Sequence, residues 1–443
     1  MTETSAGRNT FLEEYSSFEK SDGFRRHAWL RPLREAALSS FKRLGFPTTR
    51  NEEWRHTNVA PIANSSFRLP AFDFDRHKVP ELANFTFSET ECCQLIFING
   101  IFSQELSSAK CLPRGGRMKS LAAALETEKE IVAPWLASLA SHEHNAFTAL
   151  NTAFLSDGAF VYLPPGTVLS EVLHLVFVST TNGHAIACHP RNLIVIGDRC
   201  QAGIVESYAG LDGGRYLTNA VTEIVLGSGA QLDHYKLQRE SEEAFHMATL
   251  QVLQDRDSHF TSHSISLGGT LTRNDANVVM NAEGAECHLN GLYATRGRQH
   301  IDNHTCIDHA RPHCDSRELY KGILDDRSSA VFNGRIIVRK DAQKSNAKQT
   351  NRNLLLSEEA VVNAKPQLEI FADDVKCTHG ATIGHLDEEE LFYTRSRGIG
   401  LEAARTLLTY AFASDILNSL KFKPIQCQID LVLLSRLSRS RSS

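Results

Sequence analysis

Short apolar runs dominate the middle of the chain, from about residue 158 to residue 384. Val, Ile, Leu, Phe and Tyr alternate there with Gly, Asp, Asn and Ser, and patterns typical of helices are nearly absent. A turn followed by a small residue recurs at intervals of roughly 27 to 30 residues, beginning at Gly197. One interval, from Ala282 to Asp326, is about 44 residues long, which predicts an insertion or an additional half-turn.

This long and regular interval is typical of a β-solenoid, in which successive coils stack and bury a continuous apolar column. A sandwich or barrel would show turns about every 8–12 residues instead. We therefore predict a mainly β protein with its solenoid core at 158–384. An N-terminal helical and mixed region at 1–157 and a C-terminal helical domain at 385–443 would flank this core.

The N-terminal region contains one clear amphipathic helix. Apolar residues recur at helical spacing from Leu30 to Leu44, with Pro32 in the first turn and Gly45-Phe46-Pro47 after the end. Residues 50–62 predict a short helix docked through Trp54. Residues 93–98 predict a strand, and residues 119–155 predict further helix interrupted at Pro134.

A second helical pattern follows the solenoid. Acidic residues open a helix near 387, and Gly398 and Gly400 separate it from a longer helix. The longer helix carries an apolar stripe. The stripe consists of Leu401, Ala404, Leu407, Leu408, Ala411, Phe412, Ile416 and Leu420. We expect residues 386–420 to cap the open end of the solenoid, and a docking surface for a partner is the alternative.

Charge and composition narrow the function classes. The chain has 47 Lys and Arg against 52 Asp and Glu, a net charge of −5, which is no footprint for nucleic acid or an anionic membrane. No apolar run approaches the ~18 residues of a membrane span. The N-terminus does not resemble a signal or transit peptide, and the ten cysteines include no Cys-x-x-Cys. We therefore expect a cytoplasmic protein with reduced thiols.

Cys377 and His379 are the first candidate pair for chemistry. Residues two apart on a strand project from the same face, so the two side chains point together, and Thr378 points away. A thiol beside an imidazole can bind a metal, form a thiolate–imidazole nucleophile, or pack without chemistry. The nucleophile is disfavoured, because such pairs usually come from separate elements that face a cleft.

A second group of candidates lies between residues 300 and 314. It comprises His300, His304, Cys306, His309, His313 and Cys314, and Cys287 and His288 could join it. His304 and Cys306 share a strand face. A zinc site is conceivable, but the spacing does not reproduce a paired zinc-binding framework. We interpret this segment as a polar surface of the solenoid at an interface.

Enzymatic alternatives find little support in the sequence. No GxSxG elbow, no GxxxxGK[ST] phosphate loop and no HExxH motif occurs, so the chain should not hydrolyse ATP. A solenoid enzyme acting on carbohydrate would need paired carboxylates on one face. Asp373 and Asp374 are adjacent and therefore point to opposite faces. We expect a non-catalytic protein and keep a cytosolic solenoid enzyme as the alternative.

Four segments of the second half identify a family. They are SRELYKGIL (316–324), NGRIIVRKDAQKSNAKQTNRNLLLS (333–357), KPQLEIFADDVKCTHGATIG (365–384) and LFYTRSRGI (391–399). These segments closely resemble the SufB/SufD family of iron–sulfur cluster assembly scaffolds, and RNEEWRHT (50–57) resembles its SufD branch. The resemblance implies a right-handed parallel β-helix, a heterodimer with SufB through the β-helix edge, and binding of the SufC ATPase to the C-terminal helical domain.

The resemblance also implies roles for individual residues. His379 and Cys377 become candidate ligands of a transient Fe–S cluster shared with SufB. The 300–314 segment becomes part of the interface, through His304, Cys306, His309, His313 and Cys314. The candidate SufC-binding residues are Leu401, Leu407, Leu408 and Phe412. A cysteine desulfurase system is an indirect partner. Reduced flavin has been associated with the family, and no residue of this chain is assigned to it.

One departure separates the two branches of the family. SufB-type chains carry a cysteine in the segment equivalent to 349–357, which here reads QTNRNLLLS. No cysteine occurs between Cys314 and Cys377. The chain therefore resembles SufD, which would offer His379 to a cysteine of the partner. A SufB-like paralogue that carries the cluster itself is the alternative.

Overall fold

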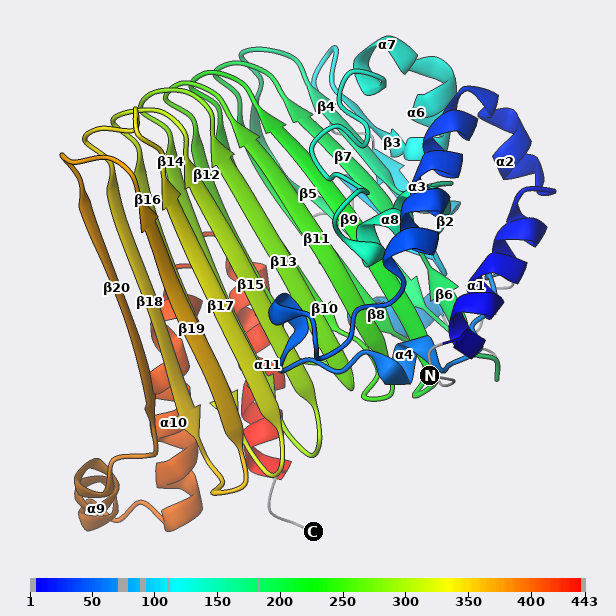
Figure 1. Cartoon of the computed structure of the whole chain (residues 1–443). Coiled ribbons are helices and arrows are strands. Elements are labelled where there is room, and N and C mark those ends of the chain that lie inside the picture. Colours follow the sequence, from blue (N-terminus) through cyan, green and yellow to red (C-terminus); the bar gives the residue numbers. More distant parts are fainter. Residues whose placement is uncertain (1–4, 71–78, 88–92, 110–111, 182, 440–443) are drawn as a thin grey trace.

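Two large, mostly parallel sheets run along the molecule and face each other across a continuous core, as the computed structural model of the chain shows (Figure 1). The structure describes residues 5–70, 79–87, 93–109, 112–181 and 183–439. Within these ranges, no helix combines the length and the apolarity that crossing a bilayer requires.

Each sheet is built from alternate strands of the chain. Sheet A contains, in spatial order, β19 (Val361–Ile370), β17 (Ser329–Val338), β15 (His300–His309), β13 (Leu271–Met280), β11 (Phe245–Gln254), β9 (Tyr216–Leu226), β7 (Arg191–Ile196), β4 (Ala159–Leu163) and β3 (Arg117–Ser120), with β6 (Ile186–Cys188) beside β9. Sheet B contains β2 (Ile101–Ala109), β1 (Cys93–Ile98), β5 (Val168–Ser179), β8 (Gln201–Gly210), β10 (Gln231–Arg239), β12 (His259–Ser266), β14 (Glu286–Thr295), β16 (Asp315–Leu324), β18 (Asn346–Leu355) and β20 (Lys376–Gly384).

This alternation makes a β-solenoid and confirms the predicted fold class. From β7 to β20 the chain crosses from one sheet to the other at every turn, and each strand pairs in parallel with the strand one coil away. The 44-residue interval after Ala282 holds no insertion. Strands β14, β15 and β16 fill it. The repeated turns up to Ala282 connect a strand of sheet A to the next strand of sheet B, whereas those from Asp326 onward connect sheet B to sheet A. The longer interval therefore contains an additional half-turn.

The solenoid begins before residue 158. The strand predicted at Cys93–Ile98 is β1, and it pairs in parallel with β5. Strand β3 pairs antiparallel with β4. The first strands of the N-terminal region therefore extend the same two sheets, and they share the core that Ile194, Ile204 and Leu232 form further along.

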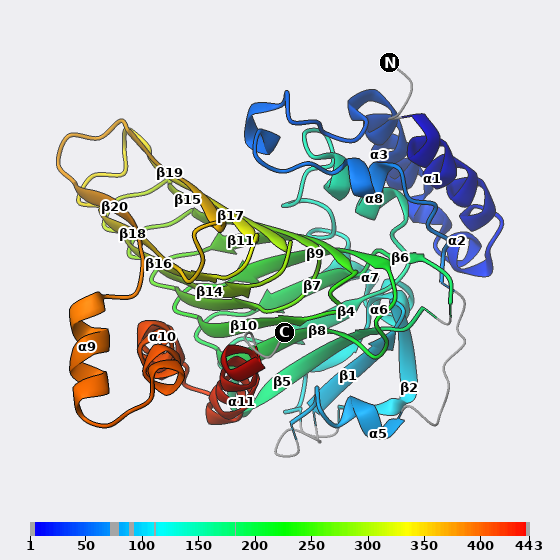
Figure 2. The same cartoon turned by 90° about the horizontal axis from the view of Figure 1, so that it is seen from below.

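Helices cover the outer face of sheet A at its N-terminal end (Figures 1 and 2). The predicted helix is α3 (Arg31–Leu44), which Gly45 ends with a φ of 64°. Phe41 of α3 and Phe147 of α8 (Ala146–Ala153) pack with Phe245 of sheet A. The other helices of the N-terminal region are α1 (Ser5–Phe18), α2 (Asp22–Arg26), η1 (Ala28–Leu30), η2 (Glu52–Trp54), α4 (Ala60–Ala63), α6 (Leu121–Thr127) and α7 (Lys129–Val132), together with α5 (Val79–Leu82), which packs on sheet B.

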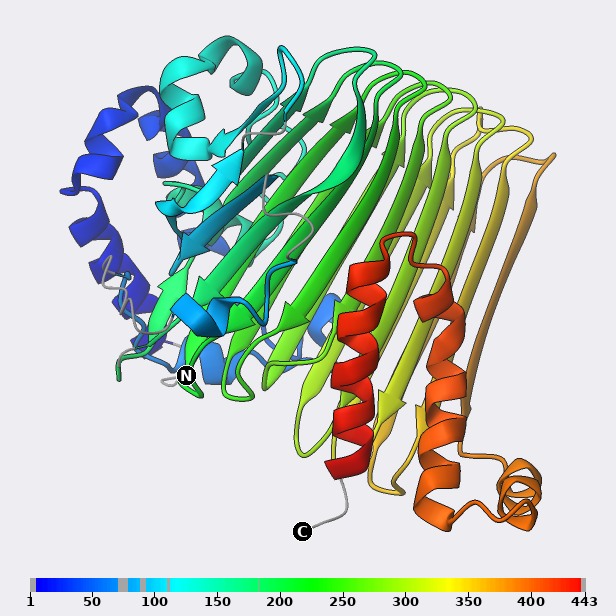
Figure 3. The same ribbon diagram turned by 180° about the vertical axis from the view of Figure 1, so that it is seen from behind.

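The C-terminal helices do not cap the solenoid, contrary to our expectation. Helices α10 (Leu401–Asn418) and α11 (Lys423–Arg439) lie along the outer face of sheet B, and α9 (Glu388–Ser396) precedes them (Figure 3). Ile416 and Leu417 pack against apolar side chains of sheet B such as Leu237 and Ile265. Apolar residues project outward from sheet B, and the helices bury them from the side. Among the residues that the structure describes, no helix covers the last coil.

Candidate functional site

The last coil of the solenoid, β19 and β20, is an open surface. Within the described residues each of these strands pairs on one edge only, β19 with β17 and β20 with β18. Four large apolar residues are exposed there: Val361 (52%), Ile370 (41%), Phe371 (63%) and Ile383 (49%). An exposed strand edge with apolar side chains is a template for pairing with another chain.

Cys377 and His379 both lie on β20 in this coil. Cys377 is half-buried and packs beside Val375 and Leu368, and its in-register neighbour is Ala347 of β18. Burial raises the pKa of the Cys377 thiol above its usual value. His379 is exposed. The pair thus combines a partly shielded thiol with an accessible imidazole at the edge that the solenoid leaves unpaired.

Two donors are fewer than the about four ligands that an iron–sulfur cluster takes from proteins. In the part of the chain that the structure describes, no three His, Cys, Asp or Glu side chains come together so that they could hold a metal ion. Cysteines 188, 200, 287, 306, 314, 377 and 427 are free thiols. The described residues alone therefore offer an incomplete ligand set at the last coil.

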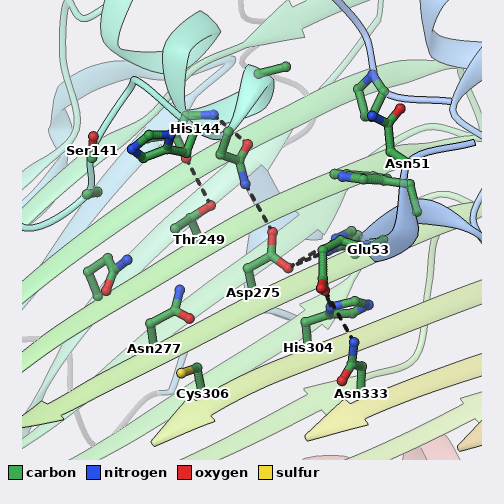
Figure 4. A pocket seen from close by; sticks show the side chains of 18 of the residues that line it. Asn51, Glu53, Ser141, His144, Thr249, Asp275, Asn277, His304, Cys306 and Asn333 are labelled. Carbon is green, nitrogen blue, oxygen red and sulfur yellow. Dashed lines mark hydrogen bonds and ion pairs between the residues drawn. The ribbon is translucent and has the colours of Figure 1, made fainter. Parts of the chain in front are cut away.

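The 300–314 segment divides between the outside and the inside of the solenoid. His304 and Cys306 point outward from β15 into a groove of about 730 Å³ between sheet A and the segment around Trp54 (Figure 4). His309 is fully buried, and its Nε2 lies 2.8 Å from Ser316 Oγ. Cys314 is also buried, whereas His313 is exposed in the turn after β15. His309 and Cys314 thus do not reach the surface of this chain.

A charged network fixes His304 at one side of the groove. Its Nε2 lies 2.9 Å from Asp302 Oδ1, and its Nδ1 lies 3.3 Å from Glu53 Oε2. Arg273 donates to Asp302 Oδ2 at 2.7 Å and stacks on the Trp54 ring, with 3.8 Å between Cζ and the ring centroid. Burial alone would lower the pKa of His304, but the two carboxylates outweigh it and raise the pKa to about 9. His304 is therefore an imidazolium that joins the N-terminal segment to sheet A.

Cys306 is one step further along the same strand face. It is partly buried, and burial raises the pKa of its thiol. Asn277 and Arg335 are its in-register neighbours on sheet A. A thiol with a raised pKa is a poor nucleophile and a poor metal ligand at neutral pH. Figure 4 shows Cys306 and Asn277 side by side on the floor of the groove.

A second apolar surface lies on the C-terminal helices. Phe392 and Tyr393 of α9 are 76% and 60% exposed. Leu401 and Leu407 of α10 are exposed as well, whereas Leu408 and Phe412 are partly buried. We call Phe392, Tyr393, Ile399, Leu401 and Leu407 the α9–α10 surface. The sequence pattern placed Leu401 and Leu407 in the apolar stripe of the helix. It gave no role to Phe392 and Tyr393, although two adjacent aromatic residues after an acidic first helical turn could have indicated an exposed apolar site.

An ion pair between Lys321 and Asp415 holds this surface to the solenoid. Lys321 points outward from β16, and its side chain is 3% exposed. Its Nζ donates to Phe412 O at 2.8 Å and to Asp415 Oδ2 at 2.5 Å. The lysine comes from the SRELYKGIL segment, which therefore has a visible structural role: it seats α10 on sheet B.

Comparisons with known proteins agree with this architecture. A family model described as "SUF system FeS cluster assembly, SufBD core domain" matches residues 177–412, and a second, "SufBD protein N-terminal region", matches residues 7–175. The chain belongs to the SufBD family of iron–sulfur cluster assembly proteins. The core match spans most of the solenoid and continues into α10.

Several SufBD relatives match over nearly their whole length. A SufBD family protein of Synechocystis is 35% identical over 89% of this chain and 88% of its own. The iron–sulfur cluster assembly protein SufD of Escherichia coli is 28% identical over 94% of this chain and 95% of its own. SufD of Bacillus subtilis is 27% identical over 92% of this chain and 93% of its own. The resemblance to the SufB/SufD family stated from the sequence is confirmed, with SufD-like relatives.

Proposed function

We propose that this SufBD-family chain is the SufD-like, non-catalytic subunit of a SufBCD complex, in which it pairs with a SufB-type subunit through its last coil. The observation that carries the proposal is the unpaired edge of β19 and β20, where apolar side chains are exposed beside Cys377 and His379. The relatives named SufD in two bacteria support the choice of branch.

The cluster is the cargo of this site rather than a resident cofactor. His379 would supply an imidazole to a nascent cluster whose thiolate ligands come mainly from the partner, and Cys377 is a second donor once deprotonated. Two donors on β20 suit a shared and transient site. A cysteine desulfurase system would supply the sulfur indirectly. The free cysteines of the described residues agree with a cytoplasmic, reducing location.

The α9–α10 surface is the proposed docking site for the SufC ATPase. It presents two exposed aromatic side chains and two exposed leucines on helices that Lys321 and the apolar contacts of Ile416 hold against sheet B. Exposed aromatic and leucine side chains on a rigid element are typical of protein interfaces. Movement of α10 on ATP binding would pass directly to sheet B, to which it is fixed.

The deciding experiment measures iron and acid-labile sulfide after anaerobic reconstitution. The samples are this chain alone, the chain with SufB-type and SufC-type subunits, and the same complex with His379→Ala. We expect cluster in the wild-type complex, little in the isolated chain, and a strong loss with His379→Ala while the complex still assembles. Equal cluster content in the wild type and the variant would move the chemistry onto the SufB-type subunit and refute the shared site.

A further inference from the structure

We propose that Gln349, held in place by Glu318, is a positioning residue for His379. Its side-chain oxygen would accept a hydrogen bond from one ring nitrogen of His379, which leaves the other nitrogen as the electron-pair donor to iron. The inference rests on the proposed function, because it concerns the geometry of the ligand at the same site.

The three side chains stand in one column of sheet B. Glu318 on β16 is in register with Gln349 on β18, and Gln349 is in register with His379 on β20. Neighbouring strands of a sheet are about 4.8 Å apart, and in-register side chains point from the same face. Glu318 and Gln349 are almost completely buried inside the solenoid, whereas His379 is on the uncovered last coil.

Of the two polar atoms of the Gln349 amide, one makes a hydrogen bond to another described residue and the other makes none. Its Nε2 donates to Glu318 Oε2 at 2.7 Å, toward the interior of the solenoid. Its Oε1 is buried and has no hydrogen-bond partner among the described residues. A buried carbonyl oxygen without a donor is destabilising, so the structure holds an acceptor that is ready for a donor from the next coil. The donor in register is the imidazole of His379.

Space for this arrangement comes from the opposite sheet. At Gly334 of β17, a Cβ would lie 2.3 Å from Gln349 Nε2 and 2.8 Å from Phe332 Cζ. Any side chain at 334 would therefore push the amide out of its place. The absence of a side chain there lets Gln349 extend across the interior while it remains bonded to Glu318.

The chemical reason for such a partner is general. A histidine that binds a metal nearly always donates its second ring N–H to a carboxylate, a carbonyl or a water, which fixes the tautomer and the ring orientation. An exposed imidazole without that bond samples both tautomers and several ring orientations. Gln349 is placed to select one tautomer before the partner subunit or iron arrives.

The test uses the full chain and two readouts. In histidine-labelled protein, ring ¹⁵N shifts at a pH where imidazole is neutral report the tautomer of His379, and the signal is assigned by its loss in His379→Ala. We expect one tautomer in the wild type and a mixture in Gln349→Met, which has a similar length but no acceptor. Thr350→Val, on the opposite face of β18, is the matched control and should leave the tautomer unchanged.

The second readout is cluster binding by the assembled complex. We expect about a 10-fold or greater loss of cluster affinity in Gln349→Met, as for other partners of metal-binding histidines. Glu318→Gln keeps a hydrogen-bond acceptor for the Gln349 amide and should therefore retain most of the cluster affinity. If Glu318 acted only through its charge, this variant would lose that affinity instead. A Gln349→Met complex with an unchanged His379 tautomer and normal cluster binding would overturn the inference.

Failure of the inference is distinguishable from failure of the proposed function. If His379→Ala abolishes the cluster and Gln349→Met changes neither readout, the shared site stands and the positioning role is refuted. If Gln349→Met disturbs the tautomer while His379→Ala leaves the cluster intact, the hydrogen bond is supported and the cluster site is refuted.

Discussion

His304 illustrates how one residue can join two distant parts of this chain. It sits between Asp302 of its own strand and Glu53 of the N-terminal segment, which are 249 positions apart in sequence (302 minus 53). Asp302 is fully buried, and Thr57 also donates to it at 2.6 Å. Burial would raise the pKa of Asp302, but Arg273 and His304 outweigh it and hold that pKa well below its usual range. The groove of Figure 4 therefore has a charged wall that depends on a protonated imidazole.

The residue-scale prediction is a loss of stability at alkaline pH. The pKa of His304 in the folded protein, about 9, lies above the ordinary histidine value of 6.5. Its contribution to stability is therefore complete below pH 6.5 and is lost as pH rises through 9. Because Glu53 is exposed and solvent screens its charge, we expect the free energy of unfolding to fall by only about 2 kcal/mol between pH 7 and pH 9.5. Thermal denaturation across this range measures it. In His304→Gln that part of the pH dependence should vanish, and a slope equal to the wild type would exclude His304 as its source.

At the scale of elements, α10 shows that helical periodicity does not fix which face is buried. The sequence stripe ran from Leu401 to Leu420, but Leu401 and Leu407 are exposed, whereas Ala413 and Ile416 pack against sheet B. The chain has apolar residues on both sides of this helix. Sheet B selects one side through shape and through Lys321, and the other side remains as the α9–α10 surface.

The element-scale prediction separates docking from packing. Leu407→Asp should change the free energy of unfolding by about 0.5 kcal/mol or less, because Leu407 is 50% exposed, while SufC-type ATPase binding falls strongly. Ile416→Asp, in the same helix but fully buried, should cost about 3 kcal/mol or more. Denaturant unfolding and a pull-down with the ATPase measure both. Normal ATPase binding by Leu407→Asp would remove the α9–α10 surface from the proposed interface.

On the scale of the whole molecule, the solenoid is protected along its sides and open at its last coil. The N-terminal helices lie on sheet A and the C-terminal helices on sheet B, and no described strand pairs with the outer edges of β19 and β20 (Figure 2). A stacked β structure that ends without a polar cap is prone to pair with another edge. The same arrangement that prevents capping thus provides the surface on which a second solenoid could continue the sheets.

The prediction at this scale concerns assembly. Ile383→Lys places a charge at the exposed edge of the last coil and should prevent association with the SufB-type subunit, with little change in stability. Val168→Lys is the matched control, because Val168 is 63% exposed on β5, far from that edge in the strand order. Size-exclusion chromatography with light scattering gives the result. Loss of the heterodimer in both variants, or in neither, would contradict the assignment of the interface to β19 and β20.

Local sequence determined the elements of this protein. The helical spacing of apolar residues from Leu30 to Leu44, followed by Gly45 with its positive φ, predicted α3. The apolar run at Cys93–Ile98 predicted β1. The regularly spaced turns predicted the solenoid. Turns and strands can be predicted in this way because both depend on residue types within a few neighbouring positions. The family resemblance carried the choice of Cys377 and His379, which the local pattern alone left open between metal binding, nucleophilic chemistry and packing.

Only the tertiary structure decided which elements meet. It placed α10 and α11 on the side of the solenoid, and it separated the buried His309 and Cys314 from His304 and Cys306 in the groove. It also stacked Glu318, Gln349 and His379 in one column. These outcomes depend on the register between coils about 30 residues apart and on the packing of helices against sheets. Both are set by contacts between distant residues, which no local pattern encodes.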